Sequence, residues 1–313
     1  MEKAKQQEII AAADQYMALK KIKRAQLARE VGISDATVSQ IWNGKYLGDP
    51  SAVLKKVARH IGFDTEAKPQ KEKTWRRYNT NNLAAIQEMC ADAQENSRFL
   101  AMSAKTDLGK TTGLEHYRIK SGAPNVHYVL CDVNMTRKEF LNAILRSMGL
   151  STEGTIYERM NRICVALLKA NKPLLILDDV GKLPDNCLRQ IQVIYDNTET
   201  GGKRYAGIIL AGTDHLERYI NKMADKGKMG FDEFRRRIEY WQPLAEINDS
   251  FIKGVAEEFG ITDPDAVSYL IKNVKGYQVL RDYMLNYQKY ITKHPNTEIS
   301  QREIIYSLTH KSV

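Results

Sequence analysis

The fold is decided by the stretch Phe99-Leu100-Ala101-Met102-Ser103-Ala104-Lys105-Thr106-Asp107-Leu108-Gly109-Lys110-Thr111-Thr112. Its apolar start predicts a buried strand, and Ala104 to Thr112 matches G-x-x-x-x-G-K-[ST], except that Ala104 stands at the first Gly position. Backbone N–H groups of such a loop cradle phosphate; Lys110 can reach the β- and γ-phosphates, and the Thr111 hydroxyl can bind Mg²⁺. Ala104 is compatible with this loop if its φ is negative. On this stretch alone, an ordinary strand-to-helix turn remains the alternative.

A second motif lies about seventy residues further on and reads Leu174-Leu175-Ile176-Leu177-Asp178-Asp179. An apolar strand that ends in two carboxylates favours a cation at its end, and a magnesium nucleotide supplies one. We expect Asp178 to hold Mg²⁺ through water and Asp179 to orient an attacking water. The alternative is that both carboxylates only cap the next helix.

Two later features extend this site. The apolar run Ile208 to Gly212 predicts a strand that ends at Thr213, whose polar side chain can sense the γ-phosphate. Further on stand Arg235, Arg236 and Arg237. They indicate either an arginine finger offered to a neighbouring subunit, with Arg237 as the first candidate, or a solvated basic helix face.

The hydrophobic pattern divides the chain into parts. Strand-like runs at 99–102, 126–130, 174–177 and 208–210 alternate with helical stretches, which predicts an α/β fold with a parallel sheet. Only helical patterns follow Pro243, at 251–259, 266–274, 279–290 and 299–308, and four short helices are indicated before residue 64, at 9–19, 25–31, 37–41 and 53–61. The segment 64–73 carries alternating charge and no large apolar residue, as linkers do. The predicted domains are a helix-turn-helix domain at 1–63, a linker at 64–75, an α/β core at 76–243 and a helical lid at 244–313.

The segment Gln26 to Gly44 has the spacing of a helix-turn-helix and resembles the repressor-like group of these domains. Ala28 permits close helix approach, Gly32 a tight turn, and Ser34 a helix cap, while Val38 and Ile41 face the core. The expected DNA-facing residues are Ser34, Asp35, Thr37, Ser39, Gln40, Asn43 and Lys45. Gln40 and Asn43 suit base readout and Lys45 suits phosphate, although such units also dock proteins.

The composition of the 313 residues agrees with about two soluble domains. Lys and Arg number 47 against 38 Asp and Glu, a net charge of +9, and residues 1–63 hold 11 of these bases and 6 of these acids. This balance favours a polyanionic partner but also suits a merely basic enzyme. The sequence contains no apolar run of membrane length and no signal peptide, so a cytoplasmic location is expected. The four scattered cysteines suggest neither disulfides nor a zinc knuckle.

The order of phosphate loop, Asp-Asp strand end, polar strand end, arginine cluster and helical tail resembles the AAA+ ATPases over residues 76–313. The stretches Thr136 to Leu145 and Leu210 to Leu216 are similar to the transposition target-selection branch, that of the phage Mu B protein and its transposon relatives, as is the N-terminal helix-turn-helix. The resemblance implies ATP and Mg²⁺ as cofactors and assembly as a homo-oligomeric filament or ring on double-stranded DNA of almost any sequence. It also implies recruitment of a transposase and stimulation of strand transfer, with hydrolysis clearing the DNA.

The resemblance further implies that adenine lies near Tyr78 and Asn79 and that a second arginine sensor follows Gly276 at Arg281, where a surface arginine is the alternative. Ala104 in place of Gly and Asp179 in place of the usual Glu depart from the family pattern and imply slow hydrolysis. Two other functions stay open. One is a nucleotide-switched helix-turn-helix regulator, and the other is a helicase-loader or initiator ATPase.

Overall fold

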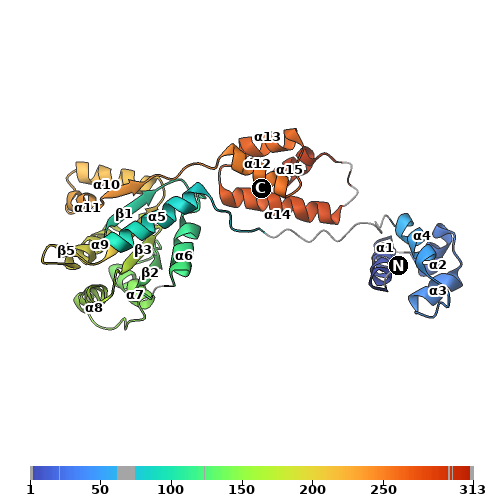
Figure 1. The fold of residues 1–313 in the computed structure, drawn as a ribbon, viewed down its shortest axis with the longest axis horizontal. Coiled ribbons are helices and arrows are strands. Elements are labelled where there is room, and N and C mark those ends of the chain that lie inside the picture. Colours follow the sequence, from blue (N-terminus) through green and yellow to red (C-terminus); the bar gives the residue numbers. More distant parts are fainter. Residues whose placement is uncertain are drawn as a thin grey trace. The chain divides into compact units, whose positions relative to one another are not determined.

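The computed structural model describes residues 3–20, 22–61, 75–122, 124–294, 297 and 299–310. The chain forms two compact units, Met1–Glu72 and Lys73–Val313, and each is described by itself (Figure 1). The predicted linker at 64–75 lies outside the described residues except for Trp75.

The N-terminal unit is a small helical domain. Its helices are α1 (Lys3–Lys20), α2 (Arg24–Val31), α3 (Asp35–Trp42) and α4 (Ser51–His60). Gly32 adopts the left-handed conformation (φ 70°) between α2 and α3, and the Ser34 hydroxyl accepts the Thr37 N–H at 3.1 Å. Val38 and Ile41 are buried, as predicted, and the helix-turn-helix is therefore confirmed.

The second unit contains a five-stranded parallel sheet with the order β2-β3-β6-β1-β7. Its strands are β1 (Phe99–Ser103), β2 (Val126–Leu130), β3 (Leu174–Asp178), β6 (Gly207–Gly212) and β7 (Tyr240–Gln242). Every residue of β3 and β6 is buried, which explains why these strands read as continuous apolar runs. The predicted α/β fold with a parallel sheet is confirmed, but β7 was missed because its three residues are only partly buried.

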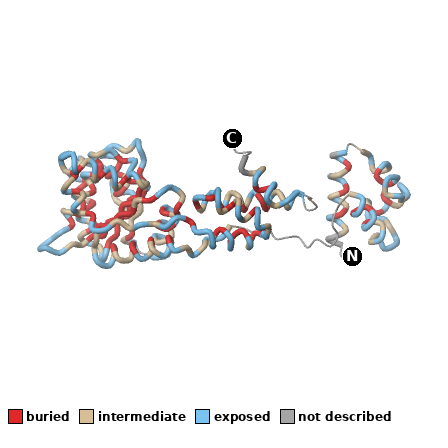
Figure 2. The backbone as a smooth tube through the Cα atoms, turned by 90° about the horizontal axis from the view of Figure 1, so that it is seen from above, coloured by how far each residue is buried: buried red, intermediate tan, exposed pale blue. Residues whose placement is uncertain are grey.

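Helices cover both faces of this sheet (Figure 1). Alternate residues along the strands point to opposite sides, so Leu100 and Met102 pack with α5 and α6, while Phe99 and Ala101 pack with α7 to α11. The buried stretches of the backbone gather inside this unit, and the exposed stretches lie at its surface (Figure 2). These helices are α5 (Asn81–Asn96), α6 (Lys110–Ser121), α7 (Arg137–Ser147), α8 (Ile156–Lys169), α9 (Asp185–Asn197), α10 (His215–Asp225) and α11 (Phe231–Arg237), with a 3₁₀ turn η1 (Val180–Lys182) after β3.

A small hairpin that the sequence analysis did not predict follows α9. It pairs β4 (Glu199–Thr200) with β5 (Lys203–Arg204) in antiparallel fashion. Gly201 and Gly202 form its turn, and both have positive φ, as a type I′ hairpin turn requires. Strands of two residues are too short to show an alternating pattern.

Four C-terminal helices form a core of their own, as the sequence predicted. They are α12 (Asp249–Glu258), α13 (Pro264–Asn273), α14 (Tyr277–Lys293) and α15 (Gln301–His310). Trp75 and Tyr78 pack against this core, with the Tyr78 and Phe251 rings edge to face at 5.4 Å.

The four cysteines are buried and unbridged, and burial raises the pKa of Cys164 and Cys187 to about 11. Within the described parts of the chain, none of the helices combines the length and apolarity needed to cross a membrane.

Candidate nucleotide site

The predicted phosphate loop connects the end of β1 to the start of α6. Positive φ angles in this loop fall on Asp107 (63°) and Gly109 (84°), not on Ala104. Alanine therefore fits at the first Gly position, because no left-handed backbone is required there. Ala104 is buried, and its N–H donates to the carbonyl of Gly212 at the end of β6.

Lys110 begins α6 and is only 7% exposed. Its Nζ donates to the carbonyl oxygens of Ala104 at 2.8 Å and Lys105 at 2.6 Å. Burial lowers the pKa of Lys110, and the nearby carboxylates of Asp178 and Asp179 oppose that effect. The ammonium is thus enclosed at the carboxyl edge of the sheet, where it can compensate negative charge. Thr111 and Thr112 follow on the exposed first turn of α6.

Asp178 ends β3 and is fully buried. One carboxylate oxygen accepts the Tyr128 hydroxyl at 2.9 Å, and the other accepts the backbone N–H of Asp179 at 2.9 Å. Burial, together with the neighbouring Asp178, raises the pKa of Tyr128 well above its ordinary value. Tyr128 escaped the sequence analysis because nothing near it on β2 marks it as a partner of a residue fifty positions away.

Asp179 has a different environment from its neighbour. It adopts a left-handed conformation (φ 57°), rare for a residue with a side chain, and its carboxylate accepts Lys182 Nζ at 2.8 Å. Its side chain is 30% exposed. The fold therefore buries the first carboxylate of the pair and turns the second outward.

Thr213 follows β6 directly and is partly exposed. Its carbonyl oxygen accepts the Ser103 hydroxyl at 2.7 Å, and that hydroxyl in turn accepts the N–H of Glu217 at 3.3 Å. Ser103, at the end of β1, therefore joins the ends of two neighbouring strands to the start of α10. This brings Thr213 to the same edge of the sheet as Lys110 and Asp178.

A cavity of about 370 Å³ adjoins the phosphate loop on the side of the C-terminal helices. Of the residues expected around a base, Tyr78 lines it and Asn79 does not; Arg281 lines it as well and pairs with Asp282 at 3.2 Å. Its aromatic and cationic walls suit a nucleotide base and its phosphates. The lining residues are Trp75, Arg77, Tyr78, Thr80, Leu83, Asp107, Gly109, Thr112, Gly113, Phe251, Tyr277, Gln278 and Arg281.

Asn82 was also missed by the sequence analysis, because it resembles an ordinary residue of a helix start. It is 3% exposed, and its amide donates to the carbonyls of Leu108 at 3.2 Å and Ala245 at 2.8 Å, while its oxygen accepts the Ala245 N–H at 2.9 Å. Asn82 thus connects the phosphate loop to the segment that leads into the C-terminal helices.

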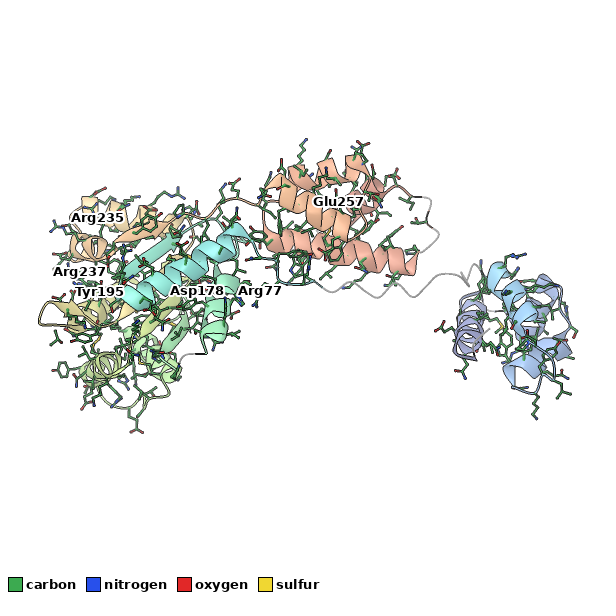
Figure 3. All side chains as sticks on the ribbon, viewed as in Figure 1. Arg77, Asp178, Tyr195, Arg235, Arg237 and Glu257 are labelled. Atoms are coloured by element: carbon green, nitrogen blue, oxygen red, sulfur yellow. The ribbon has the colours of Figure 1, made fainter. Side chains whose placement is uncertain are left out.

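The three arginines of α11 have acidic partners within the chain. Arg235 pairs with Asp225 and Asp232, and Arg237 binds Asp196 through two nitrogens at 2.7 and 3.3 Å. Arg236 pairs with Asp232 but its side chain is 71% exposed, the most exposed of the three. Figure 3 places Arg235 and Arg237 at the opposite end of the sheet domain from Arg77. None of the three arginines lines the cavity beside the phosphate loop.

In the helix-turn-helix, the expected DNA-facing residues divide into two groups. Ser34, Asp35, Gln40, Asn43 and Lys45 are exposed, whereas Thr37 and Ser39 are half-buried. The Thr37 hydroxyl bonds that of Ser34 at 2.7 Å. The exposed group therefore offers amide, carboxylate and ammonium functions to a partner.

Comparison with known proteins agrees with this architecture. Residues 93–220 match the AAA domain family, and residues 14–65 match the Cro/C1-type HTH DNA-binding domain. The chain is 24% identical over 271 residues to the Mu-like prophage FluMu DNA transposition protein B of Haemophilus influenzae, covering 84% of this chain and 89% of that protein.

Solved structures show the same fold at low identity. The CDC6p structure of Pyrobaculum aerophilum matches at 10% identity with a TM-score of 0.54, over 79% of this chain and 70% of that one. The ORC2 protein of Aeropyrum pernix matches at 11% identity with a TM-score of 0.51, over 78% and 70%. The chain is therefore an ATPase with an AAA domain and a helix-turn-helix, and it resembles a Mu-like transposition protein B along most of both chains.

Proposed function

We propose that the chain, when it holds ATP, assembles as a homo-oligomer on double-stranded DNA and delivers that DNA to a transposase, stimulating strand transfer. The observation that carries the proposal is the similarity to a DNA transposition protein B, which covers 84% of the chain. That share is about twice the length of the AAA match at residues 93–220, so the similarity extends well beyond the ATPase core.

In this proposal the loop from Ala104 to Thr112 holds the phosphates through its N–H groups, and Lys110 neutralises the β- and γ-phosphates. Tyr78 and Asn79 lie beside the base, and Arg281 approaches the phosphates from α14. Tyr78 and Arg281 line the cavity next to the loop, which supports their assignment more directly than that of Asn79.

The residues present also fit a magnesium ion. A hydroxyl at Thr111 and a buried carboxylate at Asp178 are oxygen ligands of the kind that Mg²⁺ prefers. Thr111 follows Lys110 on α6, and Asp178 lies near enough to Lys110 to influence its pKa. When bound with the nucleotide, the ion neutralises charge on the phosphates.

Hydrolysis in this proposal is slow until an oligomer forms. Asp179 and Thr213 position the attacking water, and one of Arg235, Arg236 and Arg237 acts on the site of a neighbouring subunit. The ion pair between Asp179 and Lys182 supports slow turnover, because the Lys182 ammonium occupies a carboxylate oxygen that would otherwise hold the attacking water.

The helix-turn-helix contacts DNA through Ser34, Asp35, Thr37, Ser39, Gln40, Asn43 and Lys45. The net charge of residues 1–63 supports a phosphate-dominated and therefore sequence-tolerant contact.

The test is electron microscopy of the protein with long random-sequence duplex, with ATP or with ADP, followed by strand-transfer assays with the transposase of the same element. The proposal expects continuous coating of the duplex with ATP only, and more strand-transfer product from coated DNA. Binding of one short sequence regardless of nucleotide would contradict it. That result would support a second candidate, a helix-turn-helix regulator switched by nucleotide, which the Cro/C1-type match favours.

A further inference from the structure

One residue of the phosphate loop accepts hydrogen bonds from the first three backbone N–H groups of α14. The Tyr277 N–H donates to the Asp107 carbonyl oxygen at 3.0 Å, the Gln278 N–H to Oδ1 at 2.7 Å and the Val279 N–H to Oδ2 at 3.1 Å. The first N–H groups of a helix have no partner within it, and Gly276, at the cap position, has no side chain to accept them. Asp107 therefore caps α14 from about 170 positions away.

We propose that Asp107 is a positioning residue for the nucleotide reaction, which latches α14 to the phosphate loop and thereby holds Tyr277 and Arg281 at the cavity. Both of these side chains line the cavity, and both stand in the first two turns of α14. This inference rests on the proposed nucleotide site.

The backbone at both Asp107 and Gly276 suits the contact between the phosphate loop and α14. Asp107 adopts the left-handed conformation (φ 63°), which Asp and Asn tolerate better than other side chains. Across from it, a Cβ on Gly276 would lie 2.1 Å from Asp107 Oδ2, and the three nearest atoms to it all belong to the Asp107 side chain. Gly276 itself has extended backbone (φ −160°), open to any residue. Glycine is needed there for the room that the Asp107 carboxylate occupies.

The charge of Asp107 explains why its contact with α14 favours nucleotide binding. A carboxylate within a phosphate loop repels a bound polyphosphate, whereas the start of a 17-residue helix attracts it. The N–H groups of α14 therefore compensate a charge that would otherwise oppose nucleotide. The Lys105–Glu246 ion pair and the Asn82 bonds to Ala245 also join these regions, but they attach ahead of α12, whereas Asp107 binds the backbone of α14 itself.

The test compares Asp107→Gly with Asp107→Asn. Both variants remove the charge and both accept the left-handed backbone, but only Asn keeps an oxygen that can cap the helix. Asp263→Gly is the matched control, because Asp263 caps α13, and neither Asp263 nor any residue of α13 lines the cavity.

The first measurement is amide hydrogen exchange at Gln278 and Val279 by NMR without nucleotide. We expect about tenfold faster exchange in Asp107→Gly, an intermediate rate in Asp107→Asn and no change in Asp263→Gly, a size typical of a lost helix cap. Unchanged exchange in Asp107→Gly would overturn the latch. This measurement needs no bound ATP, so it decides the latch even if the wild-type protein fails to bind nucleotide, which would instead refute the proposed function.

The second measurement is the dissociation constant for ATP, with Gly276→Ala added to form a double-mutant cycle. We expect weaker binding by roughly five- to tenfold in Asp107→Gly than in Asp107→Asn, and a similar loss in Gly276→Ala alone. Gly276→Ala should cost nothing further in the Asp107→Gly background, because the atoms it strikes are gone. Equal affinities of the Asn and Gly variants, or additive losses in the cycle, would overturn the positioning role.

Discussion

Lys110 shares its surroundings with two adjacent carboxylates that the fold places differently. Asp178 is fully buried with a partner on each oxygen, while Asp179 is turned outward against Lys182. A buried charged group holds a fixed position, and a partly exposed one can change partners. The structure thus supports different roles for residues that the sequence presents as equal.

We predict that Lys110→Ala weakens ATP binding about 100-fold, because two charge-assisted hydrogen bonds to phosphate are lost. Titration with a fluorescent ATP analogue measures this. Lys120→Ala is the control, since Lys120 lies on the same helix but is exposed at its far end. Coating of DNA by Lys110→Ala at the same ATP concentration would contradict gating by nucleotide.

The adjacent carboxylates separate binding from turnover. Asp178→Asn is expected to weaken magnesium-ATP binding and prevent assembly, because its charge faces the metal. Asp179→Asn should retain binding and assembly and lower the hydrolysis rate by about 100-fold, since orienting water matters in the transition state. Nucleotide binding and phosphate release are the two measurements. The same loss of binding in both variants would refute the division of roles.

Helix α11 carries three arginines, and their ion-pair partners change which of them is the best candidate for the arginine finger. The sequence analysis favoured Arg237 as the finger, with Arg235 and Arg236 as further candidates. Arg237 is held by Asp196 of α9, whereas Arg236 is largely exposed. An arginine that acts on a neighbouring subunit must be able to release its ion-pair partners within its own chain. The greater exposure of Arg236 therefore makes it the favoured finger.

Arg236→Ala is therefore expected to preserve ATP binding and to lower DNA-stimulated hydrolysis by about 10³. Arg237→Ala should instead lower the thermal midpoint by breaking the ion pair with Asp196. Mixing Arg236→Ala with Lys110→Ala protein should partly restore turnover, because the second variant still supplies an arginine to an intact site. Mixtures that never recover would exclude action in trans.

His127 on strand β2 makes the stability of the folded protein depend on pH. Burial lowers the pKa of His127 below 6.5, although the hydrogen bond to the Ser147 carbonyl opposes this. The folded state therefore prefers the neutral ring, so this contribution to stability is complete above pH 6.5 and is lost as the pH falls through the lower, folded-state pKa. Between about pH 6.5 and about 5, the thermal midpoint of His127→Gln should fall less than that of the wild type. If the thermal midpoints of the two proteins fell by the same amount with pH, His127 would not contribute to the pH dependence of stability.

Over the whole chain, a compact basic N-terminal unit precedes an ATPase unit, and we expect the two to perform separable tasks. Deleting residues 1–63 removes a net charge of +5 and none of the candidate nucleotide residues. We predict weaker DNA affinity, unchanged ATP binding and a shallower salt dependence, the slope of log K against log salt falling by about 0.9 for each DNA phosphate that the shortened protein no longer neutralises. An unchanged slope would make the helix-turn-helix a protein-docking module.

Prediction from sequence succeeded where the physical cause is local. Gly32 and Ser34 form the turn and cap within a few residues, and the apolar runs of β3 and β6 follow from burial on both faces. The missed elements β4, β5 and β7 are two or three residues long, too short for a pattern. Whether the predicted site residues bind ATP, metal and DNA as proposed stays a prediction for the experiments above.

The helix-turn-helix, the parallel sheet and the residue types at the loop and strand ends could be predicted from sequence, because caps, turns and burial periods are properties of neighbouring residues. Which side chains complete the candidate site depends instead on tertiary packing. Asp107 caps a helix far along the chain, Asn82 reaches Ala245, and Tyr128 binds Asp178. These bonds join segments that meet only after the strands pair and the C-terminal helices pack. The residues next to Asp107, Asn82 or Tyr128 in the sequence therefore do not predict its partner.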